Sequence, residues 1–554
     1  MHLLADITII FAVSVGAILV CHRLGIPSSV GFLLAGVLAG PGVLGLVEAT
    51  EQVELLAEIG VVLLLFVIGL EFSIGGLWEM RKQFLLGGSI QMFGTAIIVG
   101  IGTYFLGSTV SQSVFLGLVV ALSSTAVVLK MLQERVELDS PHGRMVLGTL
   151  IYQDIAVVPL MLMAPLLAGG LATGADGGPL MFLVRVVGIL AGAYVAYRWI
   201  VPWVLYHIAR TASKEAFLLG VIVICAAIAL ITHQAGLSLA LGAFLAGLII
   251  SESEYSQQAV AVMLPFRDVF MSLFFVSIGM LLDVNFLLAH PVQLVMLTLG
   301  IIIIKPIVGA VAALALGLPL RNAVLAGVAL GQIGEFSLVA TEVGVAAGLV
   351  DHEVFQTVLD TAVASMVLAP AMMAAGPRIA DTIVGLPFLS RFREGFGSAR
   401  VSSAHPYEDH VVIVGFGVTG RNVARAAREA DVPYVALELN PETVRAEQAT
   451  GEHIHYGDAT SEAILEHINA EKAKAFVIAI NDPAGARRAT EVARHIAPNA
   501  FIVVRSRYLR ETELLHELGA DEVIADELEV SVEIFSRVLA RFLVPREDIE
   551  RFVG

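Results

Sequence analysis

The stretch TLIYQDIAVVPL, residues 149–160, carries one charged side chain, Asp154, inside a long apolar run. An acid at the centre of a membrane helix costs about 2.5–3.5 kcal/mol on insertion scales. Asp154 could be a structural carboxylate that is paired with a cation. Because an ionisable group at membrane depth is a functional hypothesis by default, we expect instead that it binds a transported ion or proton.

The composition of the chain is that of a polytopic α-helical membrane protein. Of 554 residues, 57% are hydrophobic and 15% are charged, and the mean hydropathy is +0.84. Soluble domains do not reach these values. The net charge of −17 argues against a nucleic-acid partner. Cys21 and Cys225 lie in apolar runs, so we interpret both as buried small hydrophobes. The first apolar stretch lacks a basic start and a cleavage site, so we expect a retained helix and not a signal peptide.

Thirteen apolar segments are long enough to be candidate membrane spans, since a spanning helix needs about 20 apolar residues. They lie near 5–22, 28–46, 52–71, 83–107, 112–132, 143–169, 180–205, 215–232, 236–250, 262–282, 291–316, 321–346 and 353–376. The second and ninth are short, so twelve spans are an alternative.

The loops between these segments differ sharply in charge. With an external N-terminus, the outer loops hold Glu48, Glu51, Asp176, Asp283, Asp351 and Glu353. The inner loops hold Arg23, Arg81, Lys82, Lys130, Arg135, Arg144, Arg210, Lys214, Arg267, Arg321 and Arg378. Cytoplasmic loops carry the Lys/Arg excess, so we expect the N-terminus outside and the C-terminal part in the cytoplasm.

The apolar character ends near residue 376, which divides the chain into parts. Residues 1–376 form the membrane part, and the Gly-, Pro- and Ser-rich segment 377–408 reads as a linker. A soluble domain follows at 409–545, and 546–554 form a tail.

Three further places break the apolar rule. Lys305 lies in GIIIIKPIVG of the eleventh span, either as the counter-ion of an acid or with a direct part in transport. The fifth span contains ALSSTAVVLK, with Ser124 and Thr125, where small residues could simply permit close packing. The twelfth contains VALGQIGEFSLVA, with Gln332 and Glu335, which predicts a helix that unwinds in the membrane.

The spacing of these features indicates an inverted repeat with an offset of seven spans. It would pair the fourth span with the eleventh, the fifth with the twelfth and the sixth with the thirteenth. Transporters of this kind place two broken helices and the ion site near the midplane. A lone carboxylate there can hold a cation or a proton, but not both well. If a cation and a proton compete for Asp154, and access alternates between the two membrane faces, the protein exchanges one for the other.

Several motifs together resemble the Kef-type branch of the bacterial cation:proton antiporters. They are IYQDIAVVPL, ALSSTAVVLK, GVVLLLFVIGLEFS, LPFRDVFMSLFFVSIGM and GQIGEFSLVA. The resemblance covers the whole membrane part and implies a sodium/proton-antiporter-like fold. In that fold, a core of two crossed broken helices moves as an elevator against a dimerisation domain.

The resemblance also implies roles for individual residues. Asp154 would be the essential ion- and proton-binding carboxylate, with Gln153, Ser124 and Thr125 beside it. Gln153 stands where relatives with other ion selectivity carry Asn or Asp, and the Gln-Asp pair goes with potassium. One carboxylate predicts one-for-one, electroneutral exchange of a monovalent cation, with no other metal. Support of the core is expected from Lys305, Gln332, Glu335 and Glu71.

The soluble part begins with DHVVIVGFGVTGRNVARAAREA, a strand followed by a glycine-rich turn and a helix. Gly415, Gly417 and Gly420 allow the tight turn and the close approach of a pyrophosphate. Glu438 ends YVALELN about twenty residues on, where a ribose-binding acid belongs. The strand–helix units HIHYGDAT, AFVIAIND, FIVVRSRY and DEVIADE follow. We therefore predict an α/β Rossmann domain.

The region from about His410 to Val544 resembles the regulator-of-potassium-conductance domain of Kef-type antiporters. The resemblance implies a regulatory nucleotide, AMP or NAD(H), and no catalytic cofactor. Its contacts would be Gly415, Phe416, Gly417, Gly420, Glu438, Asp458 and Ala459. Asp458 could instead cap a turn.

Glutathione control is left open by the sequence. Arg505 and Ser506 match part of the glutathione site of the best-known family members. The acidic cluster before Pro265 and the longer tail of those members are missing. The helix SVEIFSRVLARFLV is apolar on one face, and we expect it to pack or swap across a homodimer.

The sequence therefore predicts a potassium:proton antiporter of the bacterial inner membrane, gated by a cytoplasmic nucleotide-binding domain. We expect it to be a homodimer through both domains, and the sequence identifies no ancillary subunit. Sodium:proton antiport is the first alternative. A nucleotide-gated potassium channel is less favoured because no TVGYG-like filter occurs. An NAD-dependent enzyme is disfavoured because no acid–base pair accompanies the Rossmann turn.

Overall fold

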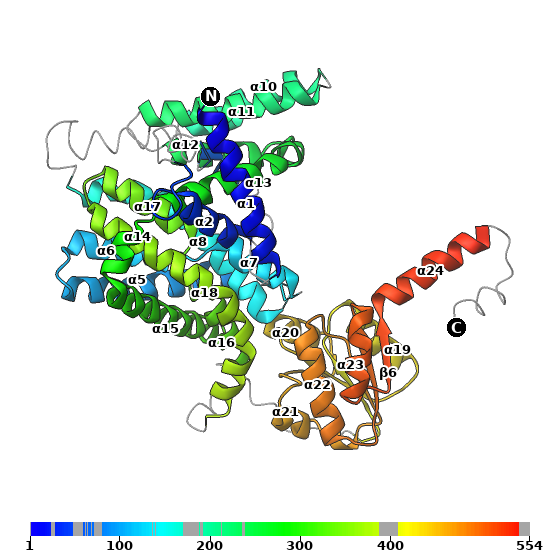
Figure 1. Cartoon of the computed structure of the whole chain (residues 1–554). Coiled ribbons are helices and arrows are strands. Elements are labelled where there is room, and N and C mark those ends of the chain that lie inside the picture. Colours follow the sequence, from blue (N-terminus) through cyan, green and yellow to red (C-terminus); the bar gives the residue numbers. More distant parts are fainter. Residues whose placement is uncertain are drawn as a thin grey trace. The chain divides into compact units, whose positions relative to one another are not determined.

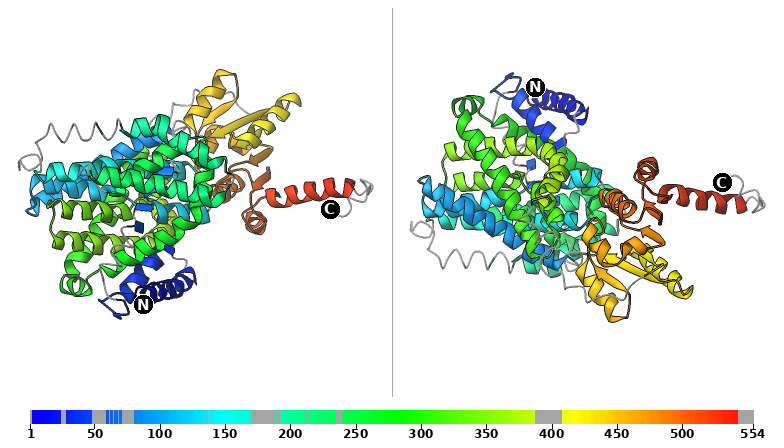
Figure 2. Two further views of the ribbon diagram at one scale, coloured as in Figure 1. Left: turned by 90° about the horizontal axis from the view of Figure 1, so that it is seen from above. Right: turned by 90° about the horizontal axis from the view of Figure 1, so that it is seen from below.

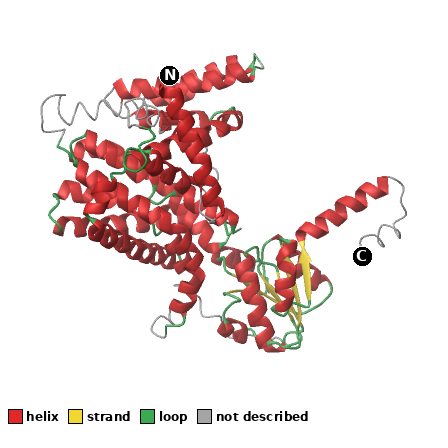
Figure 3. Ribbon diagram, viewed as in Figure 1, coloured by secondary structure: helices red, strands yellow, loops and turns green. Residues whose placement is uncertain are grey.

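The chain is described by a computed structural model in which two compact units are distinguished (Figure 1). The model describes residues 2–23, 28–47, 59–60, 62–63, 65–67, 69–70, 80–135, 137–138, 140–169, 188, 192–211, 213–234, 239–386 and 408–541. The first unit comprises 1–131, 145–316 and 323–382, and the second comprises 132–144, 317–322 and 383–554. In Figure 3, every strand belongs to the second unit.

The described residues of the membrane part are mostly helical. The bounds of the helices are α1 His2–Arg23, α2 Ser28–Ala39, η1 Gln83–Gly87, α5 Gly88–Phe105, α6 Val110–Ala121, α7 Thr125–Glu134, α8 Pro141–Leu167, η2 Ala196–Ile200, α10 Val201–Ala209, α11 Lys214–Gln234, α12 Leu239–Ser251, α13 Ser256–Met280, α14 Val284–Ala289, α15 Pro291–Ala315, α16 Leu320–Ala329, α17 Glu335–Ala346 and α18 His352–Val384.

These helices follow from the apolar runs of the sequence. Among the described residues, six helical stretches are long and apolar enough to cross a bilayer. Helical residues occur in all thirteen predicted segments, although 52–71, 180–205 and 236–250 are described only in part. The number of spans stays a prediction. The last helix, α18, continues to Val384, past the predicted boundary of the membrane part at residue 376.

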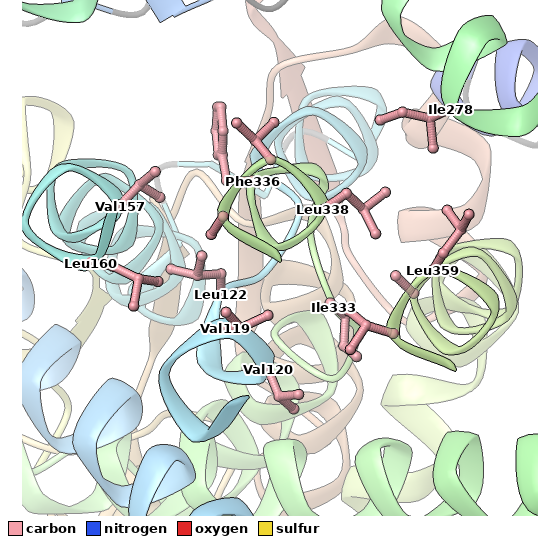
Figure 4. Packing of buried hydrophobic residues seen from close by; sticks show 14 of the residues in the cluster. Val119, Val120, Leu122, Val157, Leu160, Ile278, Ile333, Phe336, Leu338 and Leu359 are labelled. Carbon is pink, nitrogen blue, oxygen red and sulfur yellow. The ribbon is translucent and has the colours of Figure 1, made fainter. Parts of the chain in front are cut away.

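Two spans are interrupted in the middle. Helices α6 and α7 are separated by residues 122–124, and α16 and α17 by residues 330–334. Helix α17 packs along α6, and α5 packs against both α6 and α15 (Figure 2). Figure 4 shows the apolar core at the interruptions, where Val119 and Leu122 lie among side chains of α8, α17 and α18. The interrupted helices therefore lie at the centre of this core.

A second group of helices has its own apolar core. It involves α10, α11, α12 and α13, with buried residues such as Phe217, Val221, Ala246 and Met263. Helix α2 packs closely against α13 and also against α1. The membrane part thus contains a cluster around the broken helices and another around α10–α12, and α13 contributes to both.

The soluble domain is a parallel sheet with the strand order β3-β2-β1-β4-β5-β6. This is the order of a Rossmann fold, with β1 and β4 at the switch point. Its elements are β1 Val411–Val414, α19 Val418–Glu429, β2 Tyr434–Glu438, α20 Pro441–Ala449, β3 Ile454–Tyr456, α21 Glu462–His467, η4 Ala470–Lys472, β4 Ala475–Ile478, α22 Pro483–Ile496, β5 Phe501–Ser506, η5 Leu509–Glu511, α23 Thr512–Glu517, β6 Glu522–Ala525 and α24 Asp526–Arg541. The predicted fold class is confirmed in both parts.

One histidine makes the stability of the soluble domain sensitive to acid. His410 precedes β1 and is fully buried, and this burial lowers its pKa to about 4. In the unfolded chain, a histidine has a pKa of about 6.5. The unfolded state therefore binds the proton more readily. The contribution of neutral His410 to stability is complete above about pH 6.5 and is lost as the pH falls toward about 4.

We expect His410→Leu to flatten the pH dependence of unfolding of the soluble domain across that interval. The measurement is pulse proteolysis of the full-length protein in urea, following the C-terminal fragment at each pH. His495→Gln, a change at an exposed histidine of α22, is the control and should keep the wild-type profile. An unchanged profile in His410→Leu would contradict the assignment.

Candidate functional site

The two helix interruptions are hydrogen-bonded to each other. The Gly334 N–H donates to the Leu122 carbonyl at 3.1 Å, and the Ser123 hydroxyl donates to the Leu330 carbonyl at 3.0 Å. The Ser124 N–H donates to Gln332 Oε1 at 2.8 Å. A Cβ at Gly334 would lie 2.5 Å from the Ser123 carbonyl carbon, so only glycine permits this approach. The interruptions thus satisfy each other's backbone groups inside the apolar core.

Lys305 connects both interruptions from α15. Its ammonium group is fully buried and donates to the carbonyls of Val120 at 2.9 Å, Leu122 at 2.7 Å and Gln332 at 2.6 Å. These three bonds use all the donors of a lysine ammonium. In this conformation, the partners of Lys305 are backbone carbonyls and not an acid. Its part in transport stays a prediction.

The charges at the crossing complement the helix dipoles. The carbonyl end of α6 faces the Lys305 ammonium group, and cations stabilise helix C-termini. The amino end of α7 faces two acids, Asp154 and Glu335. Negative groups stabilise helix N-termini. The crossing therefore has a basic group, Lys305, at the carbonyl end of α6. It has acidic side chains at the amino end of α7.

Asp154 lies in the middle of α8 and is partly buried. The Thr125 hydroxyl, at the first residue of α7, lies 2.9 Å from Oδ1 and 3.1 Å from Oδ2. One hydroxyl is thus shared between the two carboxylate oxygens. The structure therefore brings together Asp154 and Thr125, which the sequence predicted to lie in one ion site. A carboxylate with hydroxyl neighbours suits a proton or a hard monovalent cation.

Gln153 is almost completely buried and ties α8 to the end of α6. Its Oε1 accepts from the Ser123 N–H at 2.7 Å, and its Nε2 donates to Gln91 Oε1 at 2.5 Å and to the Ala121 carbonyl at 3.1 Å. In this conformation, the side-chain carbonyl of Gln153 is therefore occupied by a backbone amide. A contact between Gln153 and a transported ion stays a prediction.

Gln91 is a site residue that the sequence analysis missed. It is fully buried on α5, and its Nε2 donates to the same Ala121 carbonyl at 3.2 Å. Ser337 also contacts α6, because its hydroxyl donates to the Val119 carbonyl at 2.7 Å. Gln91 is an amide in the apolar run GSIQMFGTAIIVGIG, and this signal could have identified it. Ser337 had no such signal, since hydroxyl groups are common in membrane helices.

The other predicted core residues are placed unequally. Gln332 bonds to the Ser124 backbone, as described above. Glu335 is buried at the first position of α17, near the Ser124 hydroxyl and the Ala126 backbone N–H. Its Oε2 has no hydrogen-bond partner among the described residues. Glu71 lies outside the described residues.

The glycine-rich turn of the soluble domain has the geometry of a nucleotide site. Gly415 has φ of +93°, and a Cβ at Gly420 would lie 2.0 Å from the Gly415 carbonyl oxygen, so both positions require glycine. Gly417 is the N-cap of α19, and a Cβ there would meet no atom within 4 Å. The Glu438 carboxylate accepts from the Phe416 N–H at 2.8 Å. The turn, the helix start and the acid therefore lie together, with open space at Gly417 for a phosphate group.

Two predicted residues near this turn have structural interactions of their own. Asp458 Oδ1 accepts from the N–H and the hydroxyl of Thr460, at 2.9 and 2.8 Å, which is the turn-capping alternative. Ala459 is buried beside it. A nucleotide contact by either residue stays a prediction.

Arg505 and Ser506, the residues matched to a glutathione site, line a small pocket at the ends of β4 and β5. The Arg505 guanidinium donates to both oxygens of Asp526, at 3.0 and 2.6 Å, and to Asn481 Oδ1 at 2.9 Å. The Ser506 hydroxyl donates to the Tyr508 carbonyl at 2.9 Å. A ligand carboxylate would therefore have to displace Asp526 from the arginine.

Comparisons with known proteins agree with this geometry. Residues 9–375 match the model of the transmembrane sodium/hydrogen exchanger family, and residues 411–526 match the TrkA-N domain. The KefB protein of Alkalimonas amylolytica, which is named for K(+) efflux antiport, is 32% identical over 97% of this chain and 81% of its own. The glutathione-regulated potassium-efflux protein KefC of Salmonella schwarzengrund is 32% identical over 90% of this chain and 78% of its own. The fold resembles the sodium proton antiporter MjNhaP1 of Methanocaldococcus jannaschii, with a TM-score of 0.51 and 16% identity over 70% of this chain and all of that one.

We expect Lys305→Met to destabilise the membrane part strongly. Three buried carbonyls lose their donor, and each buried acceptor without a donor costs about 1–3 kcal/mol. The measurement is thermal unfolding of the purified protein in detergent. Lys130→Met is the control, because Lys130 Nζ has one partly buried bond, to Ser28 Oγ at 3.2 Å. Equal losses of melting temperature in the two variants would disprove the special position of Lys305.

Proposed function

The chain belongs to the sodium/hydrogen exchanger family and to its Kef-type branch with a TrkA-N domain, and from this premise we propose that it is a potassium:proton antiporter controlled by a nucleotide. Relatives that align over 97% and 90% of this chain are named for potassium efflux. The observation that supports exchange is Asp154, a carboxylate at the crossing of two broken helices. The protein is a transporter and not an enzyme.

The proposed cycle uses one carboxylate for two ligands. A proton neutralises Asp154, whereas a potassium ion binds its ionised form together with nearby oxygen atoms such as the Thr125 hydroxyl. The Lys305 ammonium donates to three carbonyls and not to Asp154, so the charge on Asp154 can be titrated without breaking these bonds. The site is loaded from one side of the membrane and unloaded on the other as the core moves. Each cycle then exchanges one potassium ion for one proton.

The soluble domain supplies the regulation in this proposal. Gly415, Gly417 and Gly420 form the phosphate-binding turn, and Glu438 lies where a ribose hydroxyl would be held. The ligand is an adenine nucleotide, AMP or NAD(H). We place this domain in the cytoplasm of a bacterial cell, with the N-terminus on the outer side and the protein as a homodimer. Glutathione binding at Arg505 would require the arginine to leave Asp526.

We expect Asp154→Asn to abolish exchange while the protein remains folded. Asparagine keeps the shape of the side chain and removes the titrating charge. The measurement is dequenching of a pH-sensitive dye in proteoliposomes after addition of potassium or sodium, with thermal unfolding as the check on folding. Exchange that persists in Asp154→Asn would mean that another acid carries the ion. Dequenching by sodium alone in the wild type would replace potassium by sodium in the proposal.

One-for-one exchange moves no net charge, so its rate should not respond to an imposed membrane potential. The measurement is the potassium-dependent proton flux in proteoliposomes clamped at different potentials with an ionophore. An electrogenic cycle would change with voltage, since each transported charge gains about 2.3 kcal/mol per 100 mV. A steep voltage dependence would therefore show that the stoichiometry is not one to one.

We expect Gly417→Asp to prevent nucleotide binding without unfolding the domain. Asp is a favourable N-cap, and the space around this position is open, but its charge opposes a phosphate at the start of α19. The measurement is the thermal stabilisation of the full-length protein by AMP and by NADH. Thr450→Asp, which adds the same charge at the exposed end of α20, is the control. Normal stabilisation of Gly417→Asp by both nucleotides would place the site elsewhere.

A further inference from the structure

A further acid is buried in the membrane part, on α18. Asp360 on α18 is 3% exposed, and its Oδ1 has no hydrogen-bond partner among the described residues. It lies eight residues after the start of α18, about 12 Å along the helix axis, and 24 residues before its end. Asp360 therefore lies near the membrane face opposite to the one from which α18 leads to the soluble domain.

The side chain one turn earlier connects α18 to the turn between α13 and α14. Gln356 Nε2 donates to the Leu281 carbonyl at 3.0 Å, and Gln356 Oε1 accepts from the Asp283 N–H at 3.3 Å. Gln356 and Asp360 are four residues apart and share one face of the helix. Asp360 therefore lies directly beneath the place where the α13–α14 turn is attached.

The electrostatic surroundings of Asp360 are negative. The charged group that acts on it is Asp283, an exposed acid of the α13–α14 turn, whose carboxylate also caps α14 through the N–H groups of Asn285 and Phe286. On α18 itself, Glu353 is exposed two turns earlier, and Arg378 lies 18 residues further on. Lys305 on α15 donates to carbonyls of the helix crossing. A charged Asp360 would thus be buried beside a like charge, whereas the neutral acid avoids this cost.

Helix α18 also contacts the ion site. The Ile333 N–H, within the interruption between α16 and α17, donates to Ser365 Oγ at 3.1 Å. Ser365 lies five residues beyond Asp360, about 7.5 Å along the axis. The site where the α13–α14 turn packs on α18 is therefore joined to the crossing by a short stretch of the same helix.

We propose that Asp360 is a second proton-binding site, and that its protonation holds the α13–α14 turn on α18 through the neighbouring Gln356 contact. Loss of the proton adds a buried negative charge in the field of Asp283 and weakens the attachment. The turn connects α13 to α15, the helix that carries Lys305, so the attachment controls movement between the two helix groups. This inference goes beyond the exchange at Asp154. It does not require that the proton on Asp360 be transported across the membrane.

The experiment is hydrogen–deuterium exchange of the full-length protein, followed in the peptide that covers the α13–α14 turn and α14. A series from about pH 5 to about pH 9, corrected for intrinsic exchange, covers the range in which a buried carboxyl group titrates. In the wild type, we expect protection to fall by about fivefold or more as the pH rises, a typical coupling between two sites. Asp360→Asn, which mimics the neutral acid, should be protected throughout the series.

Three further variants make the result decisive. Asp154→Asn should keep the wild-type response, which separates this inference from the proposed function. Glu353→Gln, at an exposed acid of the same helix, should also keep it. Asp283→Asn retains the cap of α14 but removes the opposing charge, so the transition should move to lower pH. This variant also tests the inference if Asp360→Asn does not fold.

The inference is overturned by any of three results. Asp360→Asn could keep the wild-type pH response, or it could lose protection at every pH, as a purely structural carboxyl would. Alternatively, the transition could stay in place in Asp283→Asn.

Discussion

The ammonium group of Lys305 determines how the two broken helices can meet. Three backbone carbonyls, one from the end of α6 and one from each interruption, point at one position in the apolar core, and they need a donor there because water is excluded. A lysine supplies three donors and a positive charge at the carbonyl end of α6. Without it, two unwound segments could not remain side by side at this depth.

The negative group of the crossing, the Asp154 carboxylate, lies at the start of α7. Because the carbonyl side is already satisfied by Lys305, Gln91 and Gln153, the carboxylate of Asp154 is directed to the amino side, with the Thr125 hydroxyl as its neighbour. In the proposed function, the crossing thus separates a structural charge, on Lys305, from an exchangeable one, on Asp154. The buried ammonium stabilises the fold, and the carboxylate can change its ligand without removing the bonds that hold the interruptions together.

The sequence was sufficient for the architecture and for the residues that stand out chemically. Asp154, Lys305 and Gln332 are conspicuous because polar groups are costly in apolar runs. The glycine pattern of the soluble domain predicted its turn because few other residues adopt that backbone. Which groups actually pair could not be predicted in this way. Lys305 read equally well as the counter-ion of an acid, since the sequence does not show that carbonyls of three distant residues converge on it.

The missed residues have a common physical reason. Gln91 and Asp360 are polar residues in apolar helices, but the sequence pattern does not indicate which neighbour each side chain meets. Their importance depends on tertiary contacts between segments far apart in the sequence, such as Gln91 with Ala121 and Gln356 with Leu281. A single sequence carries no direct record of such contacts.

Helix α18 connects the helix crossing to the end of the membrane part. Ser365 accepts a hydrogen bond from the interruption between α16 and α17, and the same helix continues to Val384. Pro370 and Pro377 lie between these two points, and each removes a backbone N–H from the helix. Proline is a common cause of bending in long helices, so this part of α18 is less stiff than an uninterrupted helix. In the proposed function, a change that the soluble domain imposes on the end of α18 therefore has to pass two prolines before it reaches Ser365 and the crossing.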